Sequence, residues 1–326
     1  MDVVDRRLRQ IRRIAQCLTG LTLMLVVVSA CMRLEGAGLG CSDWPTCYAK
    51  VLSREPQVLH FGLVRILHRI SASASLLLAC FLVWRCLRPQ PIQPTCKQAV
   101  LLLMLMLLLA ILGFWSSDPR LALVGFLNIM GGLGLVILSW RVVLSTDNFP
   151  EMEMAGTKSV ILRLGVVSLF LAVMLGAWMG ASYAAIACAT LPDCSGVWWP
   201  SAAGWQALNP WVRLTAASMP GDLGGVTLHL LHRYLALAAV LLLGVACLQA
   251  LRNDQKRASA SAVLILLLVV FGLGGLTVSS GLSLWLVVSH GASSAVLLAA
   301  VVTLQRQLRS RLGPSGFPAL NPMSVD

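Results

Sequence analysis

Charged side chains are scarce in this chain. Asp, Glu, Lys and Arg make up 12% of its 326 residues, whereas 58% are hydrophobic, and the mean hydropathy is +0.82. A soluble domain carries about 25% charged residues, so this composition excludes a cytosolic enzyme, a disordered chain and a small disulfide-rich scaffold. The chain also lacks glycine loops for phosphate and flavin signatures, and its GLGG run at 272–275 is typical of close helix packing. The composition predicts a protein of the lipid bilayer.

The excess of positive charge does not predict a nucleic-acid partner. The net charge is +12, but the basic residues lie in short clusters between apolar runs and form no continuous stripe. Such clusters mark the cytoplasmic side of a membrane protein. They occur in the N-terminal tail at 6–13, in the connections at 85–97 and 252–257, and in the C-terminal tail at 306–311. We therefore expect both termini to lie in the cytoplasm.

Eight apolar runs are long enough to cross a hydrocarbon core of about 30 Å. The first run follows a basic tail, and we expect it to act as an uncleaved anchor. The last two are separated only by residues 279–281, so their boundary is the least defined. We expect an all-α membrane protein whose eight transmembrane helices form two pseudo-symmetric four-helix bundles, residues 1–150 and 151–326. The runs lie at approximately 14–32, 66–87, 97–115, 121–143, 159–180, 226–250, 259–279 and 284–304.

Two long connections, at approximately 33–65 and 181–225, lie outside in this topology. Each contains one cysteine pair with five residues between its members, Cys41 with Cys47 and Cys188 with Cys194. An oxidising compartment favours a local disulfide for each pair. A metal site is less favoured, because no histidine lies inside either cysteine segment. The other cysteines lie in or beside predicted spans, where they serve as small apolar side chains.

The two halves of the chain repeat one order of features. In each, a span ends, a C-x5-C loop with a proline follows, and the next span opens with His-Arg, at His68 and at His232. Counting 58 residues on from His232 reaches His290, and counting 60 on from His68 reaches Asn128. The repeat thus predicts one ligand-like position in the last span of each half. Because each half has four spans, the repeats run parallel, related by an axis along the membrane normal.

Histidines inside predicted spans are candidates for a functional site, because polar groups are costly there. One such histidine alone fits a simple hydrogen bond to a backbone carbonyl. His232 and His290 are different, because they come from two helices at the same depth near the outer face. Two imidazoles so placed hold a haem in a helical bundle through its two axial positions. His60 is expected in a loop and receives no role.

Three polar residues accompany these histidines. Arg69 and Arg233 each follow an axial candidate at the water boundary. There an arginine either binds haem propionates through two hydrogen bonds or simply extends to the interface. His229 lies three residues before His232 and shares its helical face. It is either a supporting group or an alternative ligand, and the sequence does not choose between these roles.

Several stretches together form a recognisable pattern. They are Arg33-Leu34-Glu35 followed by AGLGCSDWPTCY, the run GAWMGASYAAIACATLPDCSGVWWP, LHLLHR at 228–233, and LWLVVSHGASSAVLL in the last span. This pattern resembles the haem A synthase family of bacterial and mitochondrial inner membranes, over nearly the whole chain. The resemblance implies two four-helix bundles and the oxidation of the C8 methyl group of haem O to a formyl group, which gives haem A.

The resemblance also implies roles for individual residues. A haem b cofactor would be held by His232 and His290, and the haem O substrate would lie between His68, the catalytic candidate, and position 128. A haem O synthase would be the partner that supplies the substrate, and the bacterial inner membrane would be the location. Two positions depart from the family pattern. Arg65 replaces a glutamate three residues before His68, and Asn128 replaces a histidine.

These departures weaken the N-terminal site. Asparagine offers a weak oxygen ligand or a hydrogen bond in place of an imidazole nitrogen. The site would then either bind iron through His68 alone, with Asn128 beside a distal water or oxygen species, or be disabled. Arg65 reverses the charge of the family's glutamate, so a proton-transfer role is not inherited.

Three functions remain open at this point. The first is a haem A synthase-like oxidoreductase, and the second is a haem-binding paralogue that carries or senses haem without oxidising it. The third is a membrane thiol–disulfide transducer that works through the outer cysteine pairs. A structural role is preferred for Cys188 and Cys194, whereas Cys41 and Cys47 lie beside the candidate substrate site and are the candidates for redox activity.

Overall fold

The computed structural model describes residues 3–36, 62–92, 95–115, 121–146, 160–211 and 222–309. Within them, eight helices are long and apolar enough to cross a membrane. This result confirms the predicted all-α membrane class. The long helices are α1 (Val3–Gly36), α3 (Gly62–Leu87), α4 (Thr95–Leu112), α5 (Ala122–Ser145), α6 (Val160–Ala181), α7 (Leu223–Leu251), α8 (Asp254–Ser279) and α9 (Leu284–Arg309). Two short 3-10 helices, η1 (Ala184–Ala187) and η2 (Ala203–Leu208), lie between α6 and α7.

Helix ends follow from proline and from capping side chains. None of the 14 prolines falls within a helix of the described residues, because proline lacks the N–H that a helix interior needs. At the start of α7, the Asp222 carboxylate accepts a hydrogen bond from the Gly225 N–H at 2.8 Å. Between α8 and α9, Gly281 adopts a φ of +66°, which glycine tolerates best. The predicted break at 279–281 is therefore confirmed.

The basic N-terminal segment is helical rather than a tail. α1 begins at Val3, although the apolar run starts near residue 14. Arginine is a good helix former, so the helix continues through the basic segment. Arg7 then holds the end of α3, because its guanidinium donates hydrogen bonds of 2.9 Å to the carbonyl oxygens of Arg85, Cys86 and Gln90. These bonds satisfy carbonyls that have no partner within the helix.

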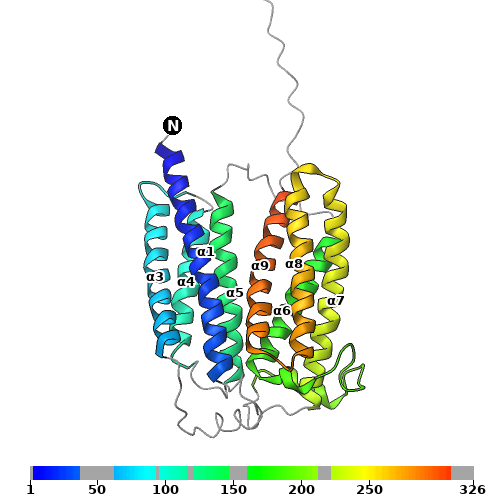
Figure 1. Cartoon of the computed structure of the whole chain (residues 1–326). Coiled ribbons are helices and arrows are strands. Elements are labelled where there is room, and N and C mark those ends of the chain that lie inside the picture. Colours follow the sequence, from blue (N-terminus) through cyan, green and yellow to red (C-terminus); the bar gives the residue numbers. More distant parts are fainter. Residues whose placement is uncertain are drawn as a thin grey trace, which may run out of the picture.

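Each half of the chain buries its own apolar core. The first core joins α1, α3, α4 and α5 and includes Leu82 and Leu102, and the second joins α6 to α9 and includes Leu243 and Leu297. Many other large apolar side chains face outward, such as Leu241, which is 60% exposed. Such a surface suits contact with lipid tails, which are as apolar as leucine. Figure 1 shows the two bundles side by side.

The bundles meet along α5 and α9 in a pseudo-symmetric way. α1 packs on α9, α6 packs on α5, and α5 packs on α9. A two-fold axis parallel to the helices relates these contacts, since α1 corresponds to α6 and α5 to α9. Trp140 of α5 also donates an Nε1–H hydrogen bond to the Thr303 hydroxyl of α9 at 2.8 Å.

The two ends of the molecule differ. The start of α1 and the end of α9 lie at the same end, which we call the terminal end (Figure 1). The segment with η1, η2 and the disulfide lies at the opposite end, the disulfide end (Figure 1). An even number of spans requires this arrangement of the termini.

Candidate functional site

Two histidine rings face each other inside the C-terminal bundle. His232 lies in the third turn of α7 and His290 in the second turn of α9, both toward the disulfide end. Their ring centroids are 6.3 Å apart, and the ring planes are inclined at 81°. Both side chains are only partly buried, although both lie in membrane-spanning helices. The structure thus brings together the pair that the sequence singles out.

A backbone carbonyl holds each ring in place. The His232 Nδ1–H donates to the Ala172 carbonyl oxygen of α6 at 2.8 Å, and the His290 Nδ1–H donates to the Val270 carbonyl oxygen of α8 at 3.0 Å. A carbonyl oxygen only accepts hydrogen bonds, so the proton of each ring must be on Nδ1. Each Nε2 therefore keeps its lone pair. This is the protonation pattern of a metal-ligating imidazole with a supporting acceptor.

A glycine faces each ring, one helical turn beyond the carbonyl that holds it. A Cβ atom on Gly176 of α6 would lie 3.0 Å from the His232 Cε1 atom, and a Cβ on Gly274 of α8 would lie 3.2 Å from the His290 Cε1 atom. Both distances are shorter than ordinary van der Waals contact, so any larger residue would move the ring. Glycine at these positions sets the place of each imidazole.

The site is therefore built from two similar helix pairs, α6 with α7 and α8 with α9. In each pair, the second helix carries the histidine, and the first supplies the carbonyl and, four residues later, the glycine. The sequence gives no direct signal for the carbonyls, because their identity depends on how the helices pack. The glycines can be seen in the sequence, but the sequence does not indicate that they lie against the histidine rings. In the GLGG run, Gly274 lies against the imidazole, whereas a Cβ on Gly275 would lie 3.8 Å from the Leu191 side chain.

The spacing of the rings suits a single metal ion between them. Two metal–nitrogen bonds of about 2.0 Å, plus about 1 Å from each nitrogen to its ring centre, put two ring centroids about 6 Å apart. Within the described residues, no group of three or more His, Cys, Asp or Glu side chains surrounds a possible metal position. Two imidazoles alone do not complete a protein metal site. A metal that brings its own equatorial ligands, as the iron of a haem does, fits this donor set.

A disulfide-closed loop lies at the disulfide end and contacts α7 through Arg233. Cys188 and Cys194 form a disulfide, as predicted. Arg233 holds the loop, because its Nη1 donates to the Asp193 carbonyl oxygen at 2.7 Å and to the Pro192 carbonyl oxygen at 3.3 Å. Its Nη2 is buried and has no hydrogen-bond partner among the described residues. Arg233 therefore does more than extend to the interface, and the N–H groups of its Nη2 remain for a ligand.

His229 holds η1, the short helix that directly precedes the disulfide-closed loop. Its Nε2 bonds the Ala185 carbonyl oxygen of η1 at 2.6 Å, and the side chain is 3% exposed. A carbonyl partner requires the proton to be on Nε2, so this nitrogen is not a free metal ligand. The sequence left two roles open for His229, a supporting group or an alternative ligand. This contact favours the supporting role.

The candidate residues of the N-terminal half are not held in this way. His68 of α3 and Asn128 of α5 are partly buried, and Arg65 and Arg69 of α3 are exposed. Neither the His68 ring nor the Asn128 amide makes a side-chain hydrogen bond within the described part of the chain. Cys41 and Cys47 lie outside the described residues, as does His60.

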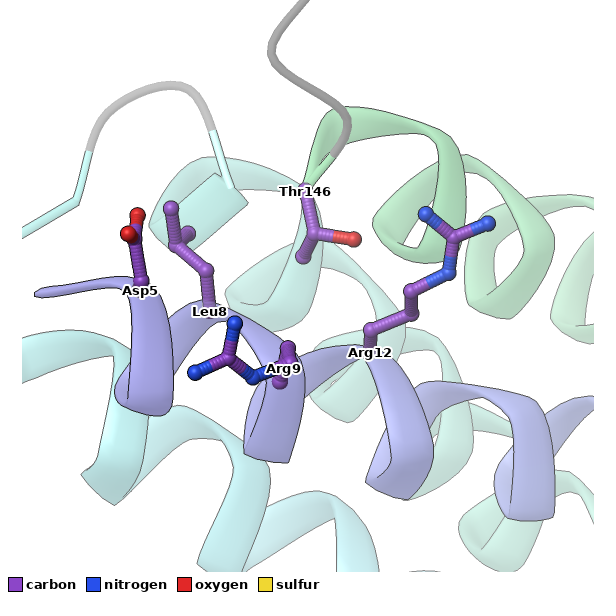
Figure 2. A pocket seen from close by; sticks show the side chains of 5 residues that line it. All are labelled: Asp5, Leu8, Arg9, Arg12 and Thr146. Atoms are coloured by element: carbon purple, nitrogen blue, oxygen red, sulfur yellow. The ribbon is translucent and has the colours of Figure 1, made fainter. Parts of the chain in front are cut away.

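A pocket of about 210 Å³ lies far from the histidines, at the terminal end. It is lined by Asp5, Leu8, Arg9 and Arg12 of α1 and by Thr146, which follows α5 (Figure 2). Its lining thus includes one carboxylate, that of Asp5, and two guanidinium groups, those of Arg9 and Arg12. The pocket has no donor set for a metal and is separate from the facing imidazoles.

Comparison with known proteins gives consistent matches. The family of cytochrome oxidase assembly proteins named COX15-CtaA matches residues 123–302. A heme A synthase from Shewanella oneidensis is 30% identical over 308 residues, which cover 87% of this chain and 92% of that protein. Heme A synthases from Shouchella clausii and Sphingopyxis alaskensis are 26% and 29% identical, over 56% and 45% of this chain and 64% and 39% of their own lengths.

Proposed function

The chain belongs to the COX15-CtaA family of cytochrome oxidase assembly proteins, and we propose that it is a haem A synthase-like membrane oxidoreductase. The names of its relatives support a role in haem A biosynthesis with haem O as the substrate. The specific reaction that we propose is oxidation of the C8 methyl group of haem O to a formyl group, in which water supplies the oxygen atom, the released protons pass to solvent and an electron acceptor outside this chain takes the electrons. The observation that carries this proposal is the pair of facing imidazoles, 6.3 Å apart, with both Nδ1 atoms held by carbonyls.

The C-terminal bundle is the proposed cofactor site. Oxidation of a methyl group removes electrons from its carbon, and a haem b, when bound, supplies one-electron transfer. His232 and His290 would hold its iron through their Nε2 atoms. The carbonyls of Ala172 and Val270 orient the two rings and increase the basicity of Nε2. The buried Nη2 of Arg233 would bind a propionate carboxylate.

The N-terminal bundle is the proposed substrate site. His68 would bind the iron of haem O, with Asn128 on α5 as the residue on the opposite side. Arg69 would reach a propionate from the exposed start of α3. Because neither His68 nor Asn128 is held by a hydrogen bond in the described residues, this site is less preorganised than the C-terminal one. A haem O synthase in the same membrane would supply the substrate.

We place the protein in a bacterial inner membrane with both termini in the cytoplasm. The arginines at the start of α1, at the end of α3 and in the α7–α8 turn all lie toward the terminal end. Clusters of this kind stay on the cytoplasmic side. The disulfide end then faces the oxidising compartment, where the Cys188–Cys194 bond is stable.

A haem-binding paralogue that does not oxidise its haem is the second candidate. The residues at positions 65 and 128 favour it, since Arg65 replaces an acid and Asn128 replaces an imidazole ligand. A thiol–disulfide transducer that works through Cys188 and Cys194 is less supported, because these cysteines are 2% and 0% exposed and are therefore hard for a partner thiol to reach. The redox candidates Cys41 and Cys47 lie outside the described residues.

Two measurements test the function. Purified protein should show the reduced absorption spectrum of a low-spin haem with two axial imidazoles. His232→Ala and His290→Ala should each abolish this spectrum, while the control His229→Gln on the same helix should retain it. A colourless wild-type protein would contradict the cofactor site. Mass analysis of haem from cells that also express a haem O synthase then separates the two candidates, because only the oxidoreductase yields haem A.

A further inference from the structure

Arg33 is a cation of the N-terminal half that reaches the C-terminal half. It lies in the last turn of α1, and its side chain is partly buried. Its Nη1 donates a hydrogen bond of 2.6 Å to the Gly180 carbonyl oxygen, near the end of α6. Helix ends carry unpaired carbonyls and partial negative charge, so this bond offsets part of the arginine's charge. It uses one of the five N–H donors of the guanidinium.

The charge of Arg33 has no carboxylate partner in the described part of the chain. The salt bridge found there joins Arg257 to Asp254, at the start of α8. Tyr183 lies close enough to interact electrostatically with Arg33, but burial raises the pKa of its phenol, and the Arg33 charge opposes this shift only in part. Tyr183 is therefore neutral near pH 7. An arginine in partly buried surroundings is costly without an anion, so the site favours an anionic ligand.

Gly180 connects Arg33 to the histidine site. Gly180 is four residues beyond Gly176 on α6, so the two glycines lie on the same helical face, about 5–6 Å apart. A Cβ on Gly176 would lie 3.0 Å from the His232 ring, and a Cβ on Gly180 would lie 3.7 Å from both Nη1 and Nη2 of Arg33. The guanidinium therefore lies about one helical turn from the imidazole, on its outward side and along the same face of α6.

A second arginine directly follows the same histidine in the chain. Arg233 follows His232 on α7, and its Nη2 is buried and unpartnered among the described residues. Arg33 and Arg233 thus offer N–H donors from two different helices near one imidazole. A haem carries two propionate carboxylates on one edge of its ring, and arginine binds carboxylates through paired hydrogen bonds.

From these contacts we infer that Arg33 is a binding residue for a haem propionate in the C-terminal bundle, supplied by the N-terminal half. The inference rests on the proposed haem site at His232 and His290. It assigns one propionate to Arg33 and leaves the other to Arg233, with both carboxylates directed toward the disulfide end. Each half of the chain then contributes to one cofactor site.

The internal repeat explains how the arginine fits. Counting eight residues back from the first cysteine of each pair reaches Arg33 in one half and Gly180 in the other. Arg33 and Gly180 are therefore equivalent positions of the repeat, and they meet at the boundary between the two bundles. Arginine brings a large side chain to this contact, and glycine brings none. A second arginine at position 180 would put two cations together, whereas glycine leaves space for one guanidinium.

The test compares haem b with its dimethyl ester, which has no carboxylates. Apo-protein is reconstituted with each form, and the rate of transfer to excess apomyoglobin gives the retention of the haem. We expect wild-type protein to retain the free acid at least about tenfold longer than the ester, as expected for charge-assisted hydrogen bonds. Arg33→Gln should bring this ratio several-fold closer to one, by faster loss of the free acid. Arg163→Gln, an exposed arginine on α6 at the terminal end, is the matched control and should keep the wild-type ratio.

The ester also reports whether the variant is folded. A variant that binds the ester like wild type but loses its preference for the free acid supports the inference. A wild-type ratio in Arg33→Gln overturns it and leaves Arg33 as a residue that only caps α6. If Arg33→Gln binds neither form, Arg33→Lys decides, because lysine keeps the charge but not the paired geometry. A reduced ratio in that variant supports the inference and an unchanged ratio overturns it. Failure of the wild type to bind either form would instead refute the haem site itself.

Discussion

The two glycines that face the imidazoles provide a sharp test of the site. Replacing Gly176 or Gly274 by alanine adds one methyl group and leaves both proposed ligands in the chain. The added Cβ would lie 3.0 Å from the His232 Cε1 atom in the first variant and 3.2 Å from the His290 Cε1 atom in the second. Each ring must then move by several tenths of an ångström, because ordinary carbon contacts begin at about 3.5 Å.

The size of the effect follows from what such a shift disturbs. The His232 ring cannot move away from α6 without lengthening its 2.8 Å hydrogen bond to the Ala172 carbonyl oxygen. A hydrogen bond of this kind contributes about 0.5–1.5 kcal/mol, and loss of a supporting contact to a metal ligand lowers metal affinity by about 10–100-fold. We expect haem affinity to fall by about tenfold in each variant. Gly176→Ala should have the larger effect, because its methyl group lies closer to the ring.

Haem titration of the apo-protein, followed by the absorption spectrum of the reduced complex, measures the effect. Gly272→Ala is the control, since a Cβ at that position of α8 has no neighbour within 4 Å. It makes the same chemical change two residues from Gly274, and alanine in a helix is favoured over glycine by about 1 kcal/mol. Equal haem affinity in Gly176→Ala, Gly274→Ala and Gly272→Ala would show that the rings are not positioned by these glycines and would refute the reasoning.

Two further predictions concern the loop and the N-terminal site. Cys188→Ser opens the disulfide loop that Arg233 holds, and it should lower stability by about 2 kcal/mol, as seen in a lower unfolding temperature without reductant. Cys17→Ser changes an exposed free cysteine of α1 and should leave that temperature unchanged. The double change Asn128→His with Arg65→Glu introduces the side chains that the resemblance to haem A synthases predicts at these positions, and under the proposed function it should raise the yield of haem A in cells that make haem O. An unchanged yield in that double variant would mean that these two positions do not limit activity.

The fold was largely predictable because its signals are local. Each apolar run is long enough to span a bilayer, and prolines lie only between the helices of the described residues, so the observed helices match the predicted runs to within a few residues at most ends. The start of α1 is the main exception. Hydropathy cannot locate the start of a helix whose first turns are basic, since arginine is polar and still favours a helix.

The site was predictable only in part, for a physical reason. An imidazole inside a span is costly, so His232 and His290 stand out in the sequence, and the C-x5-C spacing indicates the disulfide. The Ala172 and Val270 carbonyls carry no such signal, since every residue has one, and their role depends on which turn of a neighbouring helix packs against the ring. Arg33 is visible as a charge at the end of a span, but its contact with Gly180 joins residues 147 positions apart.

The repeat also allows the histidine site of the C-terminal half to be compared, position by position, with the N-terminal half. Counting twelve residues back from the first cysteine of each pair reaches Gly176 in the C-terminal half and Ser29 in the N-terminal half, and the position of His290 is held by Asn128. A serine has a Cβ where Gly176 leaves room for the His232 ring, so His68 cannot repeat that contact against α1 in the same geometry. The two bundles share a backbone arrangement, but only one has the carbonyl, glycine and histidine together in both of its helix pairs. Under the proposed function, a resident cofactor benefits from ligands that are fixed before it binds, whereas a substrate that must leave as product does not, and the two halves would differ for this reason.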